Sequence, residues 1–519
     1  MNTTKPPTFE PVSCFPLNRA LARLLFLSAL IAFFVLLLFA CAPAALSPAP
    51  IPIPATRPES TSTPFLQPTV TVTPPSPIST QTLPAHPQYQ LDVLMDYATH
   101  HLHVSETIIY PNLTNTSLRE LVLAVLPNDW PLFMLSSLRV DGVDSTAHTL
   151  SGERLTIPLA QPLAPGRDLT VSIAYDLSLP PIAARDLSQG RPQVYGFSPR
   201  QINLIDWYPF IVPYDAGRGW LLHPPTAFGE YLAYDIADFD VTMHFSDPNA
   251  IPVIAASGVE QPAPDPASRR YRLDQGRTFA ISASPDFQVT SQPVGAVTVS
   301  SYYFPEDQSA GQAVLATSAQ AMQIYIDRFG PPPHTRLSAV QGDFADGMEA
   351  SAFYWLGQGY YSQYDGTPKN YLTIISAHET AHQWWFERVG NDQMSEPWLD
   401  ESLAAYSEHI YYETAYPDLL NWWWDYRINR YSPAGWVDMQ VTDASYYEAY
   451  RKAVYLNGAK FMEALRKRLG DDAFFAFLRT YATQMTSRRA TADDFFNILY
   501  QQTTTNLSDI LSAYFHKSH

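Results

Sequence analysis

Two histidines four residues apart, His378 and His382, stand in the segment "HETAHQWW". An α-helix turns once in about 3.6 residues, so both side chains project from one face and can bind the same zinc ion. Glu379, directly after the first histidine, is the candidate general base that activates a water molecule there. Zinc in such sites takes a further protein ligand and leaves one position for water. Glu401, near the start of the next helical pattern in "PWLDES", could supply that ligand.

The alternative is a solvent-exposed helix that carries His and Glu by chance. The neighbours of the motif argue against it, because Ile375, Ala381 and Trp385 place apolar side chains around the polar ones. A helix that is apolar on most sides is typical of a protein interior. The pattern therefore favours a buried metal site.

Together these segments resemble the zinc aminopeptidases of the gluzincin clan, which includes membrane alanyl aminopeptidase and leukotriene hydrolase. The likeness rests on "HETAHQWW" followed by "PWLDESLAAY". It implies one Zn²⁺ per chain, bound by His378, His382 and Glu401, with Glu379 as the catalytic base. Glu408 lies on the same helix face as Glu401 and would orient a ligand histidine. An exposed helix acid is the alternative for Glu408.

A second motif of this family, Gly-x-Met-Glu-Asn, is matched in part by "DGMEAS". The resemblance implies that Met348 and Glu349 bind substrate, with the Glu349 carboxylate holding the free amino terminus of a peptide. Such an anchor would make the enzyme an exopeptidase. Asp346 replaces the first Gly and Ala350 replaces the Asn, so an endopeptidase with the same metal site stays open.

The family's Tyr-x-Lys-Gly motif is echoed by "AVYLNGAKFM", with Asn457 in place of Lys. The resemblance implies that the Tyr455 hydroxyl donates to the oxyanion that forms during peptide hydrolysis. A donor of this kind stabilises charge that exists only in the transition state. A packing role for Tyr455 is the alternative.

The order of the predicted elements places these motifs in the second of two folded domains. Short β-type runs broken by turn residues predict an N-terminal antiparallel β domain over residues 89–293. From about Ala296 the period becomes helical, with a long helix predicted over residues 309–330. The overall class is multidomain α+β. The resemblance covers about residues 89–519 and implies that residues 294–519 form a thermolysin-like, mainly helical catalytic domain.

The N-terminal segment, residues 1–41, has the pattern of an export signal. An apolar run over residues 24–40 follows Arg19 and Arg23. Its end, Leu-Phe-Ala-Cys, resembles the lipobox of bacterial lipoproteins and predicts lipidation of Cys41; an uncleaved signal-anchor helix is the alternative. Residues 42–88, rich in Pro, Ser and Thr, predict an extended linker. We therefore expect an exported protein, anchored in the cell membrane and facing away from the cytoplasm.

Composition limits the classes of partner. The net charge of −18 and the pI near 5.1 argue against nucleic acid, whose phosphates require basic surfaces. No cysteine follows Cys41, so the predicted folded domains have neither a disulfide framework nor a cysteine-ligated metal. The sequence carries no signal for the oligomeric state.

The combined prediction is a zinc-dependent aminopeptidase that acts on peptides or proteins and is held at a membrane by an N-terminal lipid or helix. Two alternatives remain: a zinc endopeptidase and a non-catalytic peptide-binding lipoprotein. The larger family members carry a C-terminal helical solenoid that is not matched here. We therefore expect a short member whose more open cleft accepts longer peptides.

Overall fold

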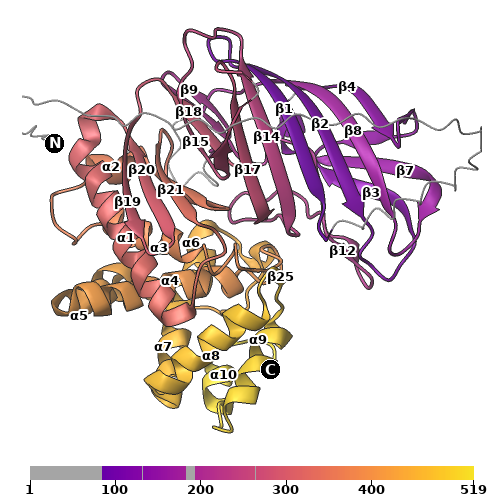
Figure 1. Cartoon of the computed structure of the whole chain (residues 1–519). Coiled ribbons are helices and arrows are strands. Elements are labelled where there is room, and N and C mark those ends of the chain that lie inside the picture. Colours follow the sequence, from indigo (N-terminus) through magenta and orange to yellow (C-terminus); the bar gives the residue numbers. More distant parts are fainter. Residues whose placement is uncertain (1–84, 131, 183–192, 264, 519) are drawn as a thin grey trace, which may run out of the picture. The chain divides into compact units, whose positions relative to one another are not determined.

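The computed structural model describes residues 85–130, 132–182, 193–263 and 265–518 (Figure 1). The predicted export signal, Cys41 and nearly all of the predicted linker lie outside these residues. Two parts follow one another in the described chain, a β domain of residues 88–284 and a mainly helical domain of residues 288–518. The expected α+β class, with a β domain before a helical region, is confirmed.

The β domain is built on an eight-stranded sheet. Its strands alternate buried and exposed side chains, as in β1 and β2, which is typical of a sheet with one face toward a core. The pairing is antiparallel throughout except between β1 and β14, which run parallel. The strand order is β16 (Val259–Gln261), β17 (Arg269–Gly276), β14 (Ala237–Phe245), β1 (Gln88–Asp96), β2 (His101–Pro111), β8 (Asp168–Ser178), β4 (Phe133–Val140) and β5 (Val143–Asp144).

Smaller sheets complete the β domain. The buried Trp207 and Tyr208 lie between them and the large sheet, and the Trp207 indole donates to the Phe279 carbonyl at 3.0 Å. One small sheet contains β15 (Val253–Ala256), β18 (Ile281–Ser284), β10 (Gln201–Leu204) and β9 (Gly196–Ser198); the other contains β11 (Phe210–Ile211), β3 (Leu118–Ala124), β7 (Arg154–Leu163) and β6 (Thr149–Ser151). A short hairpin joins β12 (Tyr214–Asp215) and β13 (Gly219–Trp220).

The helical domain opens with a five-stranded sheet covered on one face by helix α1 (Figure 1). The prediction of helical structure from Ala296 onward is wrong for the first residues, because β20 (Val297–Tyr303) is a strand. Nearly all of its residues are buried, so it lacks the alternation that marks a half-exposed strand. The sheet order is β19 (Gln288–Val294), β20, β21 (Arg336–Gly342), β23 (Phe353–Gly357) and β22 (Gly347–Ala350), so the sheet begins before the expected boundary at residue 294.

Helix α1 (Gln308–Phe329) matches the predicted long helix and ends at Gly330, whose φ of +90° suits glycine. The Tyr325 hydroxyl of α1 is within hydrogen-bonding distance of two backbone carbonyls, Ala377 at 3.1 Å and Ser407 at 2.9 Å. These carbonyls belong to helices α3 (Tyr371–Ala381) and α4 (Trp398–Ala415). One buried phenol therefore fixes the spacing of the two helices that carry the predicted metal ligands.

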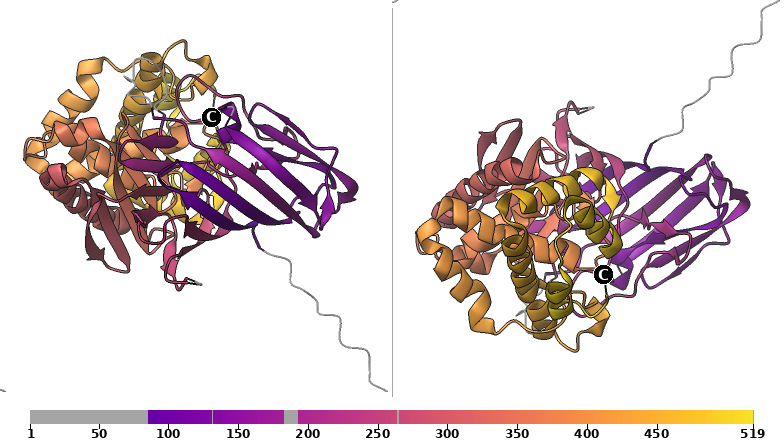
Figure 2. Two further views of the ribbon diagram at one scale, coloured as in Figure 1. Left: turned by 90° about the horizontal axis from the view of Figure 1, so that it is seen from above. Right: turned by 90° about the horizontal axis from the view of Figure 1, so that it is seen from below.

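The last four helices, α7 to α10, pack on one another at the C-terminal end of the chain (Figure 2). Two of the helices after α1 are followed by π-helical turns, in which one extra residue per turn changes the direction of the side chains that follow. The helices are α2 (Gln358–Ser362), α5 (Leu420–Trp423) with a π turn over Trp424–Ile428, α6 (Tyr447–Arg451) with a π turn over Lys452–Asn457, α7 (Gly458–Leu469), α8 (Asp471–Gln484), α9 (Ala492–Gln502) and α10 (Ser508–Tyr514). Within the described part of the chain, no helix combines the length and apolarity needed to cross a bilayer.

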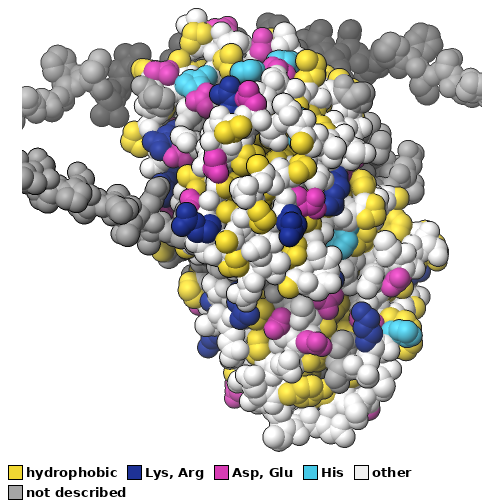
Figure 3. Space-filling view, turned by 90° about the vertical axis from the view of Figure 1, so that its right-hand side faces the viewer, with side chains coloured by type: hydrophobic (Ala, Val, Ile, Leu, Met, Phe, Trp, Pro, Cys, Tyr) yellow, Lys and Arg dark blue, Asp and Glu magenta, His cyan; other side chains and the backbone are white. Residues whose placement is uncertain are grey.

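Charged side chains on the face shown in Figure 3 are mixed in sign, with Lys and Arg lying beside Asp and Glu. The ion pairs on the surface follow the same arrangement, for example Arg139 with Asp144 at 2.7 Å. Exposed pairs of this kind contribute little to stability.

Arg277, at the end of β17, ties the β domain to the helical domain. Its guanidinium is buried and donates to three backbone carbonyls, those of Tyr234 at 3.1 Å, Glu387 at 2.9 Å and Arg488 at 2.9 Å. A side chain at Gly390 would collide with it, since a Cβ there lies 2.4 Å from the guanidinium carbon. Burial lowers the pKa of Arg277 to about 10, which still leaves it charged at neutral pH.

We predict that Arg277→Met lowers the free energy of unfolding by about 3 kcal/mol, because three buried carbonyls lose their donor at once. Urea denaturation of the soluble domains measures this change. The control is Arg272→Met on the same strand, where the side chain is exposed and pairs with Asp274 at 2.8 Å; it should stay within about 0.5 kcal/mol of wild type. Equal stability of the two variants would contradict the role given to Arg277.

Candidate active site

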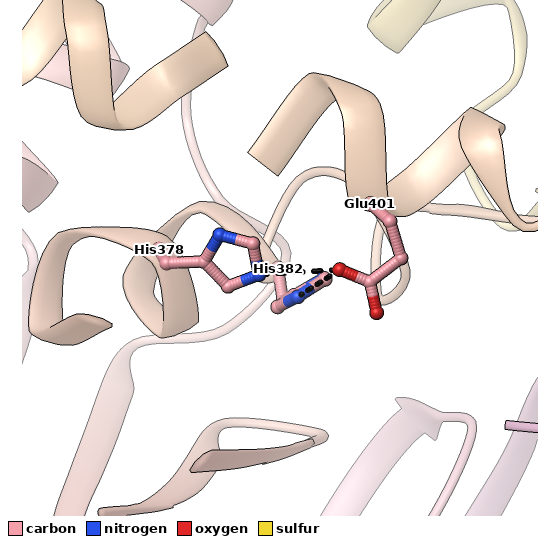
Figure 4. Close-up of side chains that lie close together, drawn as sticks. All are labelled: His378, His382 and Glu401. Atoms are coloured by element: carbon pink, nitrogen blue, oxygen red, sulfur yellow. Dashed lines mark hydrogen bonds and ion pairs between the residues drawn. The ribbon is translucent and has the colours of Figure 1, made fainter. Parts of the chain in front are cut away.

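The three predicted metal ligands converge in the interior of the helical domain (Figure 4). His378 lies in the last turn of α3, His382 directly follows that helix, and Glu401 lies in the first turn of α4. The Glu401 Oε2 atom is 3.2 Å from His378 Nε2 and 3.7 Å from His382 Nε2. All three side chains are buried, and their ligand atoms lie within 4.8 Å of one another, so the group could hold a metal ion.

This donor set fits zinc. Ligand atoms about 2.0–2.1 Å from a tetrahedral zinc lie roughly 3.3 Å from one another, close to the separations found here. A neighbouring group of Glu349, Glu379 and His382 also has its ligand atoms within 4.8 Å of one another. It offers a single imidazole, and zinc in catalytic sites prefers two or three nitrogen ligands. We therefore assign the metal to His378, His382 and Glu401.

Both imidazoles are oriented by partners on their other ring nitrogen. His382 Nδ1 lies 2.8 Å from the Trp385 carbonyl and His378 Nδ1 lies 2.9 Å from Glu408 Oε1. With a proton on each Nδ1, the Nε2 lone pairs are free to bind a metal. The predicted role of Glu408 thus has the geometry it requires.

Glu408 is in turn held by Arg427, a residue that the sequence analysis did not single out. The Arg427 guanidinium donates from Nε to Glu408 Oε2 at 2.9 Å and from Nη2 to Oε1 at 2.8 Å, and Trp423 Nε1 lies 3.2 Å from Oε2. Burial alone would raise the pKa of Glu408, but Arg427 and His378 hold it below its ordinary value. Arg427 reaches this position from the π-helical turn after α5.

The candidate base, Glu379, lies against the backbone of strand β22. A Cβ at Gly347 would come within 2.1 Å of Glu379 Oε1, so a side chain here would displace the Glu379 carboxylate. Glu379 Oε2 is buried and has no hydrogen-bond partner among the described residues. Burial raises the pKa of this carboxyl well above its ordinary value. A carboxylate with one free oxygen beside the metal ligands is placed to take a proton from water.

Tyr455 and Glu349 face the same cavity, which has a volume of about 610 Å³. The Tyr455 ring is nearly parallel to the His378 ring, with centroids 6.0 Å apart, and burial raises the pKa of its hydroxyl so that it remains a donor. The Glu349 carboxylate accepts from Gln393 Nε2 at 3.0 Å. The structure therefore brings Glu379, Tyr455 and Glu349 together with the three metal ligands.

Met348 lies elsewhere. Alternate residues of a strand face opposite sides, and Met348 lines a separate cavity beside Trp130 and Tyr231 of the β domain. The expected contact between Met348 and substrate is thus not available from the cavity that holds the metal ligands.

Residues 361–514 match the Peptidase family M1 domain. Aminopeptidase M1-B of Oryza sativa subsp. japonica is 22% identical over 219 residues, covering 39% of this chain and 25% of that protein. Aminopeptidase N of Lactobacillus helveticus is 26% identical over 156 residues, covering 28% of this chain and 18% of that protein. The matched part thus spans about a quarter or less of these curated relatives.

A solved M1 zinc metallopeptidase from Deinococcus radiodurans, in a mutant form, has a TM-score of 0.59 at 17% identity and covers 83% of this chain and 94% of that chain. The same protein bound to a Tyr-Ser-Ala substrate gives a TM-score of 0.59 at 18% identity. At this identity the likeness establishes the fold. Residues 361–514 thus resemble the M1 catalytic domain, and the fold is that of the solved M1 zinc metallopeptidase.

We predict that Arg427→Met weakens zinc binding about 10–100-fold, because the Glu408 carboxylate loses the cation that holds it against His378. Competition with a chelator measures the affinity, and Arg427→Lys should restore part of it. The matched control is Arg430→Met, an exposed arginine that stacks on Tyr426 with 4.0 Å from its guanidinium carbon to the ring centroid. Unchanged zinc affinity in Arg427→Met would rule out the proposed support of His378.

Proposed function

We propose that this protein is a zinc aminopeptidase that removes residues from the amino terminus of peptides. The observation that carries the proposal is the place of Glu349. Its buried carboxylate has ligand atoms within 4.8 Å of those of Glu379 and His382. A carboxylate there can hold an ammonium group about one residue away from the atoms that act on the peptide bond.

Each of these residues of the cavity has a separate role in the proposed reaction. Zinc bound by the two histidines and Glu401 would polarise the scissile carbonyl and make a water molecule easier to deprotonate. Glu379 takes the proton from the attacking water and gives it to the leaving nitrogen of the peptide. The Tyr455 hydroxyl donates to the oxygen on which negative charge develops. Glu349 fixes the free amino group, so cleavage follows the first residue.

The endopeptidase alternative uses the same metal ligands and differs only in the role of Glu349. An internal peptide bond brings no ammonium group to that carboxylate, which would then be buried beside Glu379 without a compensating charge. The burial of Glu349 therefore favours the aminopeptidase. A non-catalytic peptide-binding protein would have no use for the unpartnered Oε2 of Glu379.

Free and N-acetylated forms of one peptide test the proposal on the zinc-loaded enzyme. We predict hydrolysis of the free peptide only, and a loss of at least about a hundredfold in kcat for Glu379→Gln with zinc retained. Glu349→Gln should raise KM for free peptides, and acetylated peptides should stay uncleaved. Equal cleavage of both peptide forms by wild type would favour the endopeptidase.

We infer that the enzyme is exported and held at the cell membrane through Cys41. The support is the sequence pattern of residues 1–41, which lie outside the described structure, together with the Pro-rich residues that follow. Mass analysis of protein extracted from membranes should find Cys41 as the first residue, carrying a thioether-linked diacylglycerol. An intact leader with unmodified Cys41 would contradict lipidation and leave the signal-anchor alternative.

A further inference from the structure

Asp346, the residue before strand β22, has a backbone conformation unlike that of a strand. Its φ is +85°, in the region that residues with a Cβ rarely adopt. Asp tolerates this region better than most residues because its side chain can bond to the backbone nearby. Asp346 Oδ1 does so, accepting from the Gly347 N–H at 3.0 Å. Strained conformations of this kind persist mainly at functional sites.

The strained backbone changes the side that Asp346 faces. In regular strand geometry it would share a side with Met348 and point away from Glu349. Instead, Asp346 lines the same cavity as Gly347 and Glu349, while Met348 lines the other one. The turn before β22 thus adds a carboxylate to the cavity of the metal ligands.

This carboxylate has only neutral donors. Besides the Gly347 N–H, Oδ1 accepts from the Tyr360 hydroxyl at 2.9 Å. Across the described residues, no ion pair and no hydrogen bond to Oδ2 is recorded for Asp346. The two arginines of the cavity are already engaged, Arg427 by Glu408 at 2.8 Å and Arg451 by Glu448 at 2.9 Å. Burial raises the pKa of Asp346 and outweighs the opposing effects of the Tyr360 hydroxyl, the Gly347 N–H and the more distant Arg427.

The order of residues along β22 shows which part of a substrate meets Asp346. This strand is at the edge of its sheet and pairs only with β23, so a peptide can add to its free side. In the proposed function, Glu349 holds the amino terminus and Glu379, which touches Gly347, protonates the leaving nitrogen. The substrate therefore runs from Glu349, at its amino terminus, past Gly347 toward Asp346. Asp346 lies beside the residues that follow the cleaved bond.

We propose that Asp346 is a specificity-determining residue that selects peptides with Lys or Arg just after the cleaved bond. This inference rests on the proposed aminopeptidase function. The cationic side chain would approach the free Oδ2 of Asp346, while Tyr360 and the Gly347 N–H keep the carboxylate in place through Oδ1.

Matched tetrapeptides test the proposal on the zinc-loaded enzyme. Ala-Lys-Ala-Ala and Ala-Ala-Lys-Ala are compared with the same peptides carrying norleucine, which keeps the length of lysine without its charge. We expect wild type to favour lysine about tenfold in kcat/KM in Ala-Lys-Ala-Ala, the strength of a hydrogen bond to a charged group, and to show a smaller preference in Ala-Ala-Lys-Ala. Lys-Ala-Ala-Ala, with the cation before the cleaved bond, should show no such dependence on Asp346.

Two variants separate the effect of the Asp346 charge from the effect of its backbone conformation. Asp346→Asn keeps the shape and the local hydrogen bonds, and Asp346→Gly relieves the positive φ. Both should bring the lysine-to-norleucine ratio of kcat/KM close to one. A ratio unchanged in Asp346→Asn, or a ratio near one in wild type, would overturn the proposal.

Binding to Glu379→Gln separates this inference from the proposed function. Calorimetry with the lysine and norleucine peptides measures the same preference without turnover. A lysine preference that disappears in the Glu379→Gln, Asp346→Asn double variant supports the role of Asp346, even were wild type to cleave no peptide. Equal binding of both peptides to Glu379→Gln would refute that role, even with the aminopeptidase activity confirmed.

Discussion

The convergence of two imidazoles and one carboxylate on a single point governs the organisation of the helical domain. His378, His382 and Glu401 come from two helices, and each is buried. Buried polar groups are costly unless they are paired or bind a cation. Contacts on the side away from the metal position accordingly hold the two imidazoles and the helices that carry the ligands. Arg427 and Glu408 hold His378, the Trp385 carbonyl holds His382, and Tyr325 sets the spacing of the helices.

Irregular backbone supplies the side chains that regular elements could not aim at this point. The π-helical turn over Lys452–Asn457 carries Tyr455 to the His378 ring, and the turn over Trp424–Ile428 carries Arg427 to Glu408. On the opposite wall, the positive φ of Asp346 turns its carboxylate into the cavity. Each of these three irregularities costs stability and directs a side chain toward the same cavity, as is common at functional sites.

The structure brings together the three side chains that the sequence indicated as metal ligands, because their signal is local. A helix of ordinary geometry places His378 and His382 on one face, and Glu401 stands near the start of the next helical pattern. Arg427 was not predicted, because it stands in an aromatic segment. Its position against Glu408 depends on a π-helical turn, which the periodicity of the sequence does not indicate. The strand β20 was missed because burial on both sides removes its alternation. Asp346 was noted as a departure from a motif, but the direction of its side chain depends on its positive φ, which the sequence does not indicate.

The central claim is that one zinc ion binds where these three side chains meet. Crystals of the purified protein, measured on both sides of the zinc absorption edge, test it most directly. The account predicts a single strong anomalous peak bounded by His378 Nε2, His382 Nε2 and a Glu401 carboxylate oxygen, with one zinc per chain in solution. A protein that contains no stoichiometric metal after preparation in zinc, or a peak at a different group, would contradict it.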